Sequence, residues 1–142
     1  ALLANWAVHE DAAGRDPEPR WRASLAAYDQ AIAANPNSGQ AYVCRGQTWL
    51  NWAVVRGQRG QDPAEQDERA IADLTRGTEL DPRSPEALTS RGIAHQNRAG
   101  HEAAAGRDPG PDRAAAAADY EASLRLNPNQ PGLRERIAEL RK

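Results

Sequence analysis

Apolar side chains recur every three or four residues along the stretch that begins at residue 38. One face of the predicted helix carries Ala41, Cys44, Thr48, Trp49, Trp52, Ala53 and Val55. After a break at residues 60–63 the spacing resumes, and a second face carries Ala70, Ile71, Leu74, Thr78 and Leu80. The pattern therefore predicts two amphipathic helices joined by a short connection.

Short motifs mark where these helices begin and end. The segment 84–86 (Ser-Pro-Glu) fits a helix start, because Ser caps the first turn, Pro fits the first helical position and Glu suits the positive helix end. In the segment 60–63 (Gly-Gln-Asp-Pro), Gly suits the residue after a helix and Asp-Pro starts the next one, with Glu65 placed for a capping box. The helix should end before Asp81, because the residue preceding a proline is pushed out of helical geometry.

These signals return with a period of 46 residues. The step separates the Asp-Pro pairs at 16–17, 62–63 and 108–109, the prolines at 36, 82 and 128, and the asparagines at 5, 51 and 97. A fixed period of this size is typical of stacked repeats, in which each unit buries its apolar face against its neighbours. We therefore predict an all-α fold, an α-α superhelix of three helical hairpins with elongated helices and a C-terminal capping helix.

The chain 1–142 is expected to form a single repeat domain. Repeat 1, truncated at its N-terminus, covers 1–37, repeat 2 covers 38–83, repeat 3 covers 84–129, and the capping helix covers 130–142. The last helix carries Leu133, Ile137 and Leu140 on one side and charged residues elsewhere, as the end of an open stack requires. The chain begins at Ala1 in the middle of a repeat, so we expect it to be part of a larger protein.

Bulk composition fits a helical scaffold and narrows the range of partners. Leu, Ile and Val are scarce and Phe is absent, which alone would suggest disorder. Alanine offsets this, because it has the highest helix propensity and its small side chain lets helices approach closely. The net charge of −2 gives no basic field for nucleic acid or an anionic membrane, and no apolar run is long enough to span a bilayer. We therefore expect neither nucleic acid nor a membrane as partner.

The single cysteine, Cys44, excludes an internal disulfide framework and a cysteine-based zinc site. Its helix face is expected to be buried, where a cysteine acts as a small apolar filler. The bias toward arginine over lysine indicates genome composition more than a binding site, and we expect a bacterial source. One unpaired cysteine and the lack of a visible secretory segment favour a cytoplasmic location.

Positions of fixed size class recur in the predicted helices. Small residues fall at Gly46, Gly92, Ala70 and Ala116. Large residues of the second helix fall at Tyr28, Leu74 and Tyr120, and terminal prolines at Pro36, Pro82 and Pro128. Together with residues 69–82 and 86–94, this pattern resembles the tetratricopeptide repeat (TPR) family over nearly the whole chain. The resemblance implies a helical solenoid that binds other proteins.

The repeat is longer than the family standard. A TPR unit has about 34 residues, so the period of 46 leaves about 12 more residues in each copy. They lie between the two helices, around Val54–Glu65, and can form either a loop or longer helices. The Ala-rich third copy favours longer helices, which would add roughly 9 Å to each hairpin. The middle copy, with Gly57 and Gly60, fits helix least well.

The resemblance implies that a partner binds on a concave surface lined by the first helix of each repeat. The groove positions on this chain are Gln40, Val43, Gln47, Leu50 and Asn51, then Glu86, Thr89, Ile93, Gln96 and Asn97, with Ala1, Ala4 and Asn5 from the truncated copy. An asparagine amide offers two donors and an acceptor, so the column of Asn5, Asn51 and Asn97 can grip the backbone of an extended peptide. The alternative is that each asparagine bonds to the adjacent helix.

Some TPR proteins hold a C-terminal carboxylate with Lys, Asn and Arg on these helices, and that pattern is absent here. Arg45 and Arg91 lie about 200° around the helix from the groove, so a chaperone-tail adaptor is not expected. Trp6 and Trp52 form a second column, broken by Arg98, that we expect to pack between helices.

The remaining candidate residues support no further site. The pairs at 9–10 and 101–102 (His-Glu) lack the second histidine of the zinc motif, and we expect them to be solvated surface. No Ser-His-Asp arrangement, phosphate-binding glycine loop or carboxylate pair stands out, so we assign no catalytic residue, metal ligand or cofactor.

We therefore expect a non-catalytic scaffold that binds a peptide or helix of a partner protein. Two alternatives stay open. One is a self-associating assembly module whose ends stack head to tail, and the other is a regulatory domain of a larger enzyme.

Overall fold

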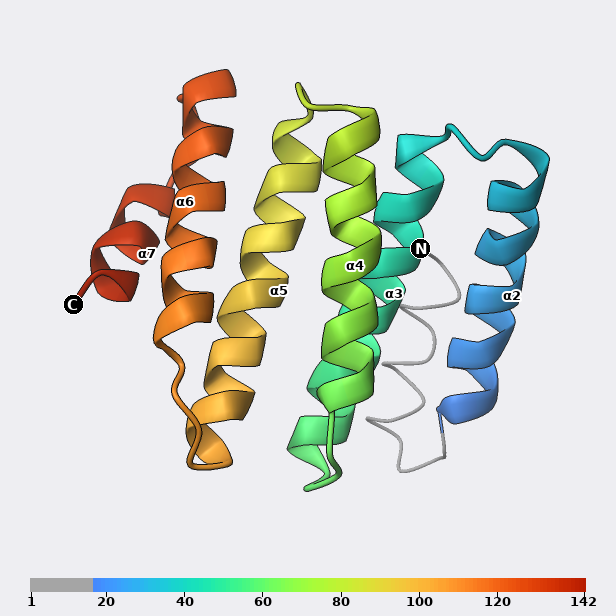
Figure 1. The fold of residues 1–142 in the computed structure, drawn as a ribbon, viewed down its shortest axis with the longest axis horizontal. Coiled ribbons are helices and arrows are strands. Elements are labelled where there is room, and N and C mark those ends of the chain that lie inside the picture. Colours follow the sequence, from blue (N-terminus) through green and yellow to red (C-terminus); the bar gives the residue numbers. More distant parts are fainter. Residues whose placement is uncertain (1–16) are drawn as a thin grey trace.

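Helices follow one another across the molecule with short connections (Figure 1). The computed structural model describes residues 17–142, and every regular element in that range is an α-helix. The helices are α2 (Glu18–Ala34), α3 (Gly39–Gln58), α4 (Ala64–Leu80), α5 (Pro85–Ala104), α6 (Gly110–Leu126) and α7 (Leu133–Leu140). The long helices run alternately up and down, and the short α7 lies against α6 at the C-terminal end. Repeat 1 lies partly outside the described residues, so only its second helix, α2, is seen.

Two serines begin the first helix of each described hairpin, as the sequence predicts. The Ser38 Oγ accepts a hydrogen bond from the Ala41 N–H at 3.2 Å, and the Ser84 Oγ accepts one from the Ala87 N–H at 3.1 Å. Each bond satisfies a backbone donor that has no partner inside the helix. The sequence motifs therefore set the start of α3 and α5.

The turns at the hairpin tips contain glycines at the positions that the sequence predicts. Gly60 and Gly106 have φ angles of +71° and +76°, a left-handed conformation that glycine adopts without strain. The Asp62 carboxylate accepts the Ala64 N–H at 3.0 Å, but Pro63 precedes α4 instead of taking its first helical position. The predicted capping box is wrong, because the Glu65 side chain extends along α4 to Arg69, 3.4 Å away.

The second helices end where the prolines require. Residues Ala34, Leu80 and Leu126 are the last of α2, α4 and α6, and each lies two positions before a proline. The residues around Val54–Glu65 divide between the end of α3, a turn at 59–63 and the start of α4. As a result α3 and α5 each have 20 residues, which gives helices about 30 Å long. The longer-helix alternative therefore describes this segment.

Buried side chains form clusters between successive helices. One cluster joins α2 to α3 through Trp21, Leu25, Trp52 and Val55, with Trp49 stacked on Trp52 at a centroid distance of 5.5 Å. A second, around Leu74, lies among α3, α4 and α5, and a third, around Tyr120, continues to Leu133 and Leu140 of α7. The expected packing roles of Trp52 and of the closing helix are confirmed by this burial.

Candidate functional site

The predicted groove residues that the structure describes lie on α3 and α5, which contact each other directly. The Gln47 side-chain amide donates to the Ser90 Oγ at 3.0 Å, so the two helices are also joined by a polar contact. The first helices of two successive hairpins therefore lie side by side, and their equivalent positions are neighbours in space.

Asn51 and Asn97 occupy equivalent positions on these helices, and both side chains are half-buried. Within residues 17–142 neither side-chain amide has a hydrogen-bond partner. The alternative that each asparagine bonds to the adjacent helix is therefore not seen in the described part of the chain. As far as residues 17–142 are concerned, both amides keep their donors and acceptor for a ligand. The third member of the column, Asn5, and the neighbouring Ala1 and Ala4 lie outside the described residues.

Other groove positions are engaged within the fold. The Gln96 Oε1 accepts a hydrogen bond from the Tyr120 hydroxyl at 2.7 Å. The Thr89 hydroxyl lies 2.7 Å from the Ser123 Oγ and donates to the Gln130 Oε1 at 3.3 Å. These contacts fix α5 against α6 and against the segment before α7. With Gln47, these side chains therefore position the groove walls.

The apolar positions are less accessible than the sequence suggested. Val43 is 4% exposed and packs in the cluster with Leu74, so its side chain does not line an open groove. The burial of Val43 depends on Gly77 of α4, which leaves room for the valine side chain. A Cβ at position 77 would lie 2.7 Å from the Val43 Cγ2. The repeat period alone does not reveal this contact. Leu50 and Ile93 are half-buried against the core clusters. Gln40 and Glu86, near the starts of their helices, are exposed.

Sequence reasoning missed a repeated ion pair inside each hairpin. Arg45 contacts Asp73 through Nε and Nη2 at 2.8 Å each, and Arg91 contacts Asp119 in the same way at 2.9 and 2.7 Å. These bonds raise the pKa of both guanidinium groups, although burial opposes the rise. The sequence held a signal, since both pairs recur at the step of 46.

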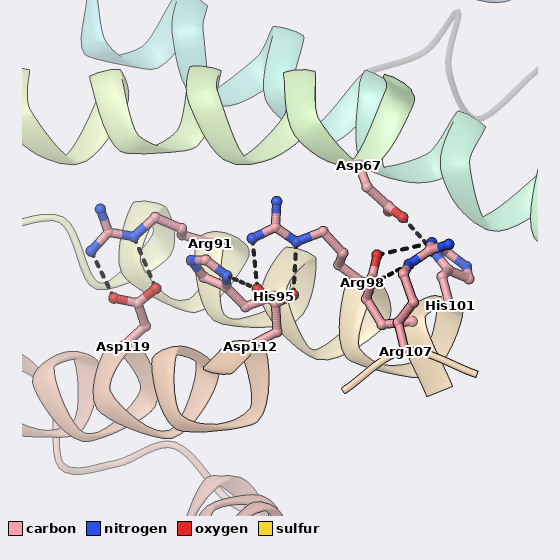
Figure 2. A network of polar contacts seen from close by, with 9 residues as sticks. Asp67, Arg91, His95, Arg98, His101, Arg107, Asp112 and Asp119 are labelled. Atoms are coloured by element: carbon pink, nitrogen blue, oxygen red, sulfur yellow. Dashed lines mark hydrogen bonds and ion pairs between the residues drawn. The ribbon is translucent and has the colours of Figure 1, made fainter. Parts of the chain in front are cut away.

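A polar junction formed by Asp67, His95, Arg98, His101 and Asp112 lies at the hairpin-tip end of α5 (Figure 2). The Asp67 Oδ2 on α4 lies 2.6 Å from the His101 Nδ1 on α5. The Asp112 carboxylate on α6 lies 2.8 Å from the His95 Nδ1 and accepts two bonds from Arg98 at 2.8 and 2.7 Å. Side chains of α5 thus pair with a carboxylate on each neighbouring helix.

The junction corrects the prediction that residues 101–102 are solvated surface. The His101 side chain is 22% exposed and lies against Asp67, whereas Glu102 pairs with Arg107 in the turn. The pairing depends on α4 and α5 coming together, and these residues lie 34 positions apart in the sequence. Local motifs therefore give no indication of it.

The two carboxylates of the junction respond differently to their surroundings. Burial raises the pKa of Asp67, and the hydrogen bond from His101 only partly opposes this. Burial alone would also raise the pKa of Asp112, but hydrogen bonds from Arg98 and His95 hold it below its ordinary value. Asp112 is thus well compensated as an anion, whereas Asp67 is not.

Among the comparisons with known proteins, the solved structures match this chain in fold. No family model matches the chain, and no curated protein matches it. Among solved structures, the Arabidopsis OM64 TPR domain matches with a TM-score of 0.64 and 18% identity, covering 99% of this chain and 92% of that one. The first TPR of Spaghetti (RPAP3), bound to the HSP90 peptide SRMEEVD, gives a TM-score of 0.63 at 15% identity, with coverages of 99% and 90%.

The second TPR domain of human RPAP3, in complex with the HSP70 peptide SGPTIEEVD, matches with a TM-score of 0.63 and 17% identity, covering 99% of this chain and 92% of that one. This chain has a TPR-like fold. At these identities the likeness concerns the fold alone.

The two junctions of the TPR-like solenoid differ in chemistry. The residues at 95, 98, 101 and 112 are His, Arg, His and Asp, whereas those one period earlier are Trp49, Trp52, Val55 and Gln66. The earlier junction is built from stacked indole rings, with Arg22 over the Trp52 ring and Arg69 over the Trp49 ring, each at 5.3 Å. The later junction holds charged and titratable groups in the same register.

A cavity of about 450 Å³ lies beside the polar junction. The turns of both hairpins line it, together with Asp67, His101, Glu102 and Arg107. Within residues 17–142 no group of three His, Cys, Asp or Glu side chains is arranged to hold a metal ion. Among the helices that the structure describes, none combines the length and apolar character needed to cross a membrane.

Proposed function

We propose that this protein is a non-catalytic interaction scaffold that holds an extended peptide or a helix of a partner protein. The proposed groove is lined by the first helix of each repeat. Its residues are Asn5, Gln40, Gln47, Leu50, Asn51, Glu86, Thr89, Ile93, Gln96 and Asn97. The observation that carries the proposal is the pair of half-buried amides of Asn51 and Asn97, which have no partner within residues 17–142.

The chemistry of these amides suits a peptide backbone. A main chain presents an N–H donor and a C=O acceptor at each residue other than proline, and an asparagine amide can pair with both. Because α3 and α5 contact each other, the two amides can bind successive parts of one extended segment. Hydrogen bonds from the asparagine amides recognise only the peptide backbone. Selectivity for the partner's side chains must therefore come from contacts with the other groove residues.

The charge of the groove disfavours an acidic tail. The RPAP3 domains bind peptides that end in Glu-Glu-Val-Asp, whereas none of the proposed groove residues here is Lys or Arg, and Glu86 is exposed. A carboxylate-rich peptide would lie near Glu86 without a compensating cation. We therefore expect a neutral or basic partner segment.

The experiment that tests the proposal compares capture of partner proteins by the wild type and by an Asn51→Ala/Asn97→Ala variant from lysate of the source cells. The matched control is Asn37→Ala/Asn129→Ala, which removes two exposed asparagines in the turns before α3 and α7 that are not among the proposed groove residues. We expect one protein to be retained by the wild type and the control and lost by the groove variant, at equal melting temperatures. Equal retention by all three would contradict the groove.

Self-association is the second candidate, because one apolar side chain stands out at the C-terminal end. Leu126 is 42% exposed and is the only large apolar residue so exposed within residues 17–142. A cavity of about 500 Å³ between α6 and α7, lined by Leu124, Pro128 and Ile137, lies close to it in sequence. Mass measured over a range of concentrations tests this, since Leu126→Gln should abolish any increase that the wild type shows.

A further inference from the structure

His101 fills the contact between the second hairpin and the first. Its Nδ1 lies 2.6 Å from the Asp67 Oδ2 on α4. Its other ring nitrogen faces α3, where a Cβ at Gly57 would lie 2.9 Å from Nε2. The imidazole therefore touches both helices of the first hairpin, and only a glycine at position 57 leaves it room.

Asp67 depends on His101 for compensation of its charge. The Asp67 side chain is 4% exposed, and within the described residues the His101 ring is the only side chain that hydrogen-bonds to it. The nearby Arg98 directs its Nε and Nη2 at Asp112. A buried carboxylate without a cation is costly, because few water molecules reach it.

We propose that His101 and Asp67 form a proton-sensitive joint between the two hairpins, which tightens when His101 binds a proton and loosens when it loses one. A neutral imidazole gives the carboxylate one N–H bond, whereas an imidazolium adds an opposite charge at the same distance. Imidazole is the side chain that ordinarily titrates between about pH 5 and 8, so this is the range in which the joint is tested.

The charged groups around this pair are hydrogen-bonded to other partners. Asp112 of α6 is hydrogen-bonded to Arg98 and His95. Glu102 of α5 is hydrogen-bonded to Arg107 in the turn that follows α5. Two further acids lie in the turns and are exposed: Asp62 accepts the Ala64 N–H, and Asp108 accepts the Gly110 N–H. The α3 contact is Gly57, which carries no charge. Each neighbouring charge thus has a hydrogen-bond partner of its own. Arg98 and Asp112 also act on Asp67 through space, in opposite directions, whereas His101 is the group that contacts the Asp67 carboxylate directly.

The equivalent contact one repeat earlier, between α2 and α3, shows that the fold does not require a charged pair at this position. Val55 occupies the position of His101 there, and it packs with Trp21 and Trp52 in an apolar cluster. An apolar contact of that kind does not change between pH 5 and 8. The proton response therefore belongs to the α4–α5 joint alone within residues 17–142.

His95 provides a matched control. It is the other histidine in the described part of the chain, and it pairs with Asp112 inside the second hairpin. Within the described residues its side-chain hydrogen bond is with α6 and not with the first hairpin. A substitution at His95 therefore removes a histidine of the same junction without touching the proposed joint.

The test measures amide hydrogen exchange of the first turn of α4 and the last turn of α5 between pH 6 and 8, corrected for the intrinsic pH dependence of exchange. In the wild type we expect protection at both places to fall as the pH rises, by about fivefold or more. In His101→Gln the corrected protection should stay constant with pH, and His95→Gln should behave like the wild type. The proposal is overturned if the wild type shows no change, or if His101→Gln keeps it.

A second variant covers the case in which His101→Gln does not fold. Asp67→Asn removes the negative charge but keeps an oxygen acceptor for the imidazole, so His101 no longer gains an ion pair on protonation. We expect this variant to lose the pH dependence while the hairpins stay together. An unchanged pH dependence in Asp67→Asn would show that the joint does not depend on this pair.

Discussion

Gly92 lets α5 lie directly against the ring of Tyr120. A Cβ at this position would lie 2.5 Å from the Tyr120 Cε1, and a Cβ at Gly46 would lie 2.7 Å from the Leu74 Cγ. Both distances are far below van der Waals contact, so each glycine sets how closely the first helix of its hairpin approaches the second. The small positions identified in the sequence are therefore packing contacts between hairpin helices.

Alanine at Gly92 should destabilise the protein, whereas alanine at Gly100 should not. Alanine is favoured over glycine in a helix by about 1 kcal/mol, and Gly100 has open space around its Cα. At Gly92 the added methyl group meets the fully buried Tyr120, and such overpacking costs about 1–3 kcal/mol. Urea unfolding of both variants measures the difference. A Gly92→Ala variant that is more stable than the wild type would show that α5 and α6 can move apart without loss of stability.

At the scale of the element, α5 acts as a connector between two partners. Its Arg91, His95 and Arg98 side chains bond to carboxylates on α6, and its His101 side chain lies against Asp67 on α4 (Figure 2). Arg91, His95 and Arg98 lie on the side of α5 opposite the proposed groove, whereas His101 lies one helical turn after Asn97. One helix can therefore carry a ligand surface and an interhelical polar network at the same time.

The two carboxylates beside α5 should give opposite pH dependences of stability. The pKa of Asp112 is lowered in the fold, so its contribution is present above its ordinary pKa and is lost as the pH falls through the lowered one. Asp112→Asn should thus cost about 1–3 kcal/mol near pH 7, and the cost should shrink below about pH 4.

The pKa of Asp67 is raised, so its contribution to stability is present at low pH and is lost as the pH rises through the raised value. The free energy of unfolding of Asp67→Asn, relative to the wild type, should therefore increase with pH in that range. Denaturant unfolding between about pH 3 and 7 measures both trends. Parallel trends for the two variants would contradict the assigned environments.

At the scale of the whole molecule, the solenoid is an open stack that α7 closes. Leu133 and Leu140 are 6% and 8% exposed, and they cover the cluster around Tyr120 and Leu124 of α6. The outer face of α7 is charged, so the stack ends in a surface that water can solvate.

Leu133→Ala/Leu140→Ala should weaken this closure. Each substitution removes apolar contacts and costs about 2–5 kcal/mol if the site is rigid, and the exposed side of α6 should make the protein associate as its concentration rises. Thermal unfolding and light scattering measure the two effects. Arg134→Ala, on the exposed face of α7, is the control and should change neither. A stable, monomeric double variant would show that the stack needs no cap.

The sequence determined the helices and their order in this protein. Serine caps, left-handed glycines and prolines act through bonds and steric contacts within a few residues, so the bounds of α3, α4 and α5 can be read from the chain. The period also identified the residues that pack between neighbours, among them Gly92 and Trp52, because each hairpin buries the same face. The column of Asn51 and Asn97 was visible for the same reason.

Only the tertiary structure decided which side chains meet across helices. Val43 is buried because Gly77 makes room for it, and His101 lies against Asp67 because α5 crosses the end of the preceding hairpin. The Arg45–Asp73 pair joins residues 28 positions apart. Such contacts depend on the approach and rotation of two helices, which no local pattern specifies, whereas helix boundaries depend on neighbours in the chain.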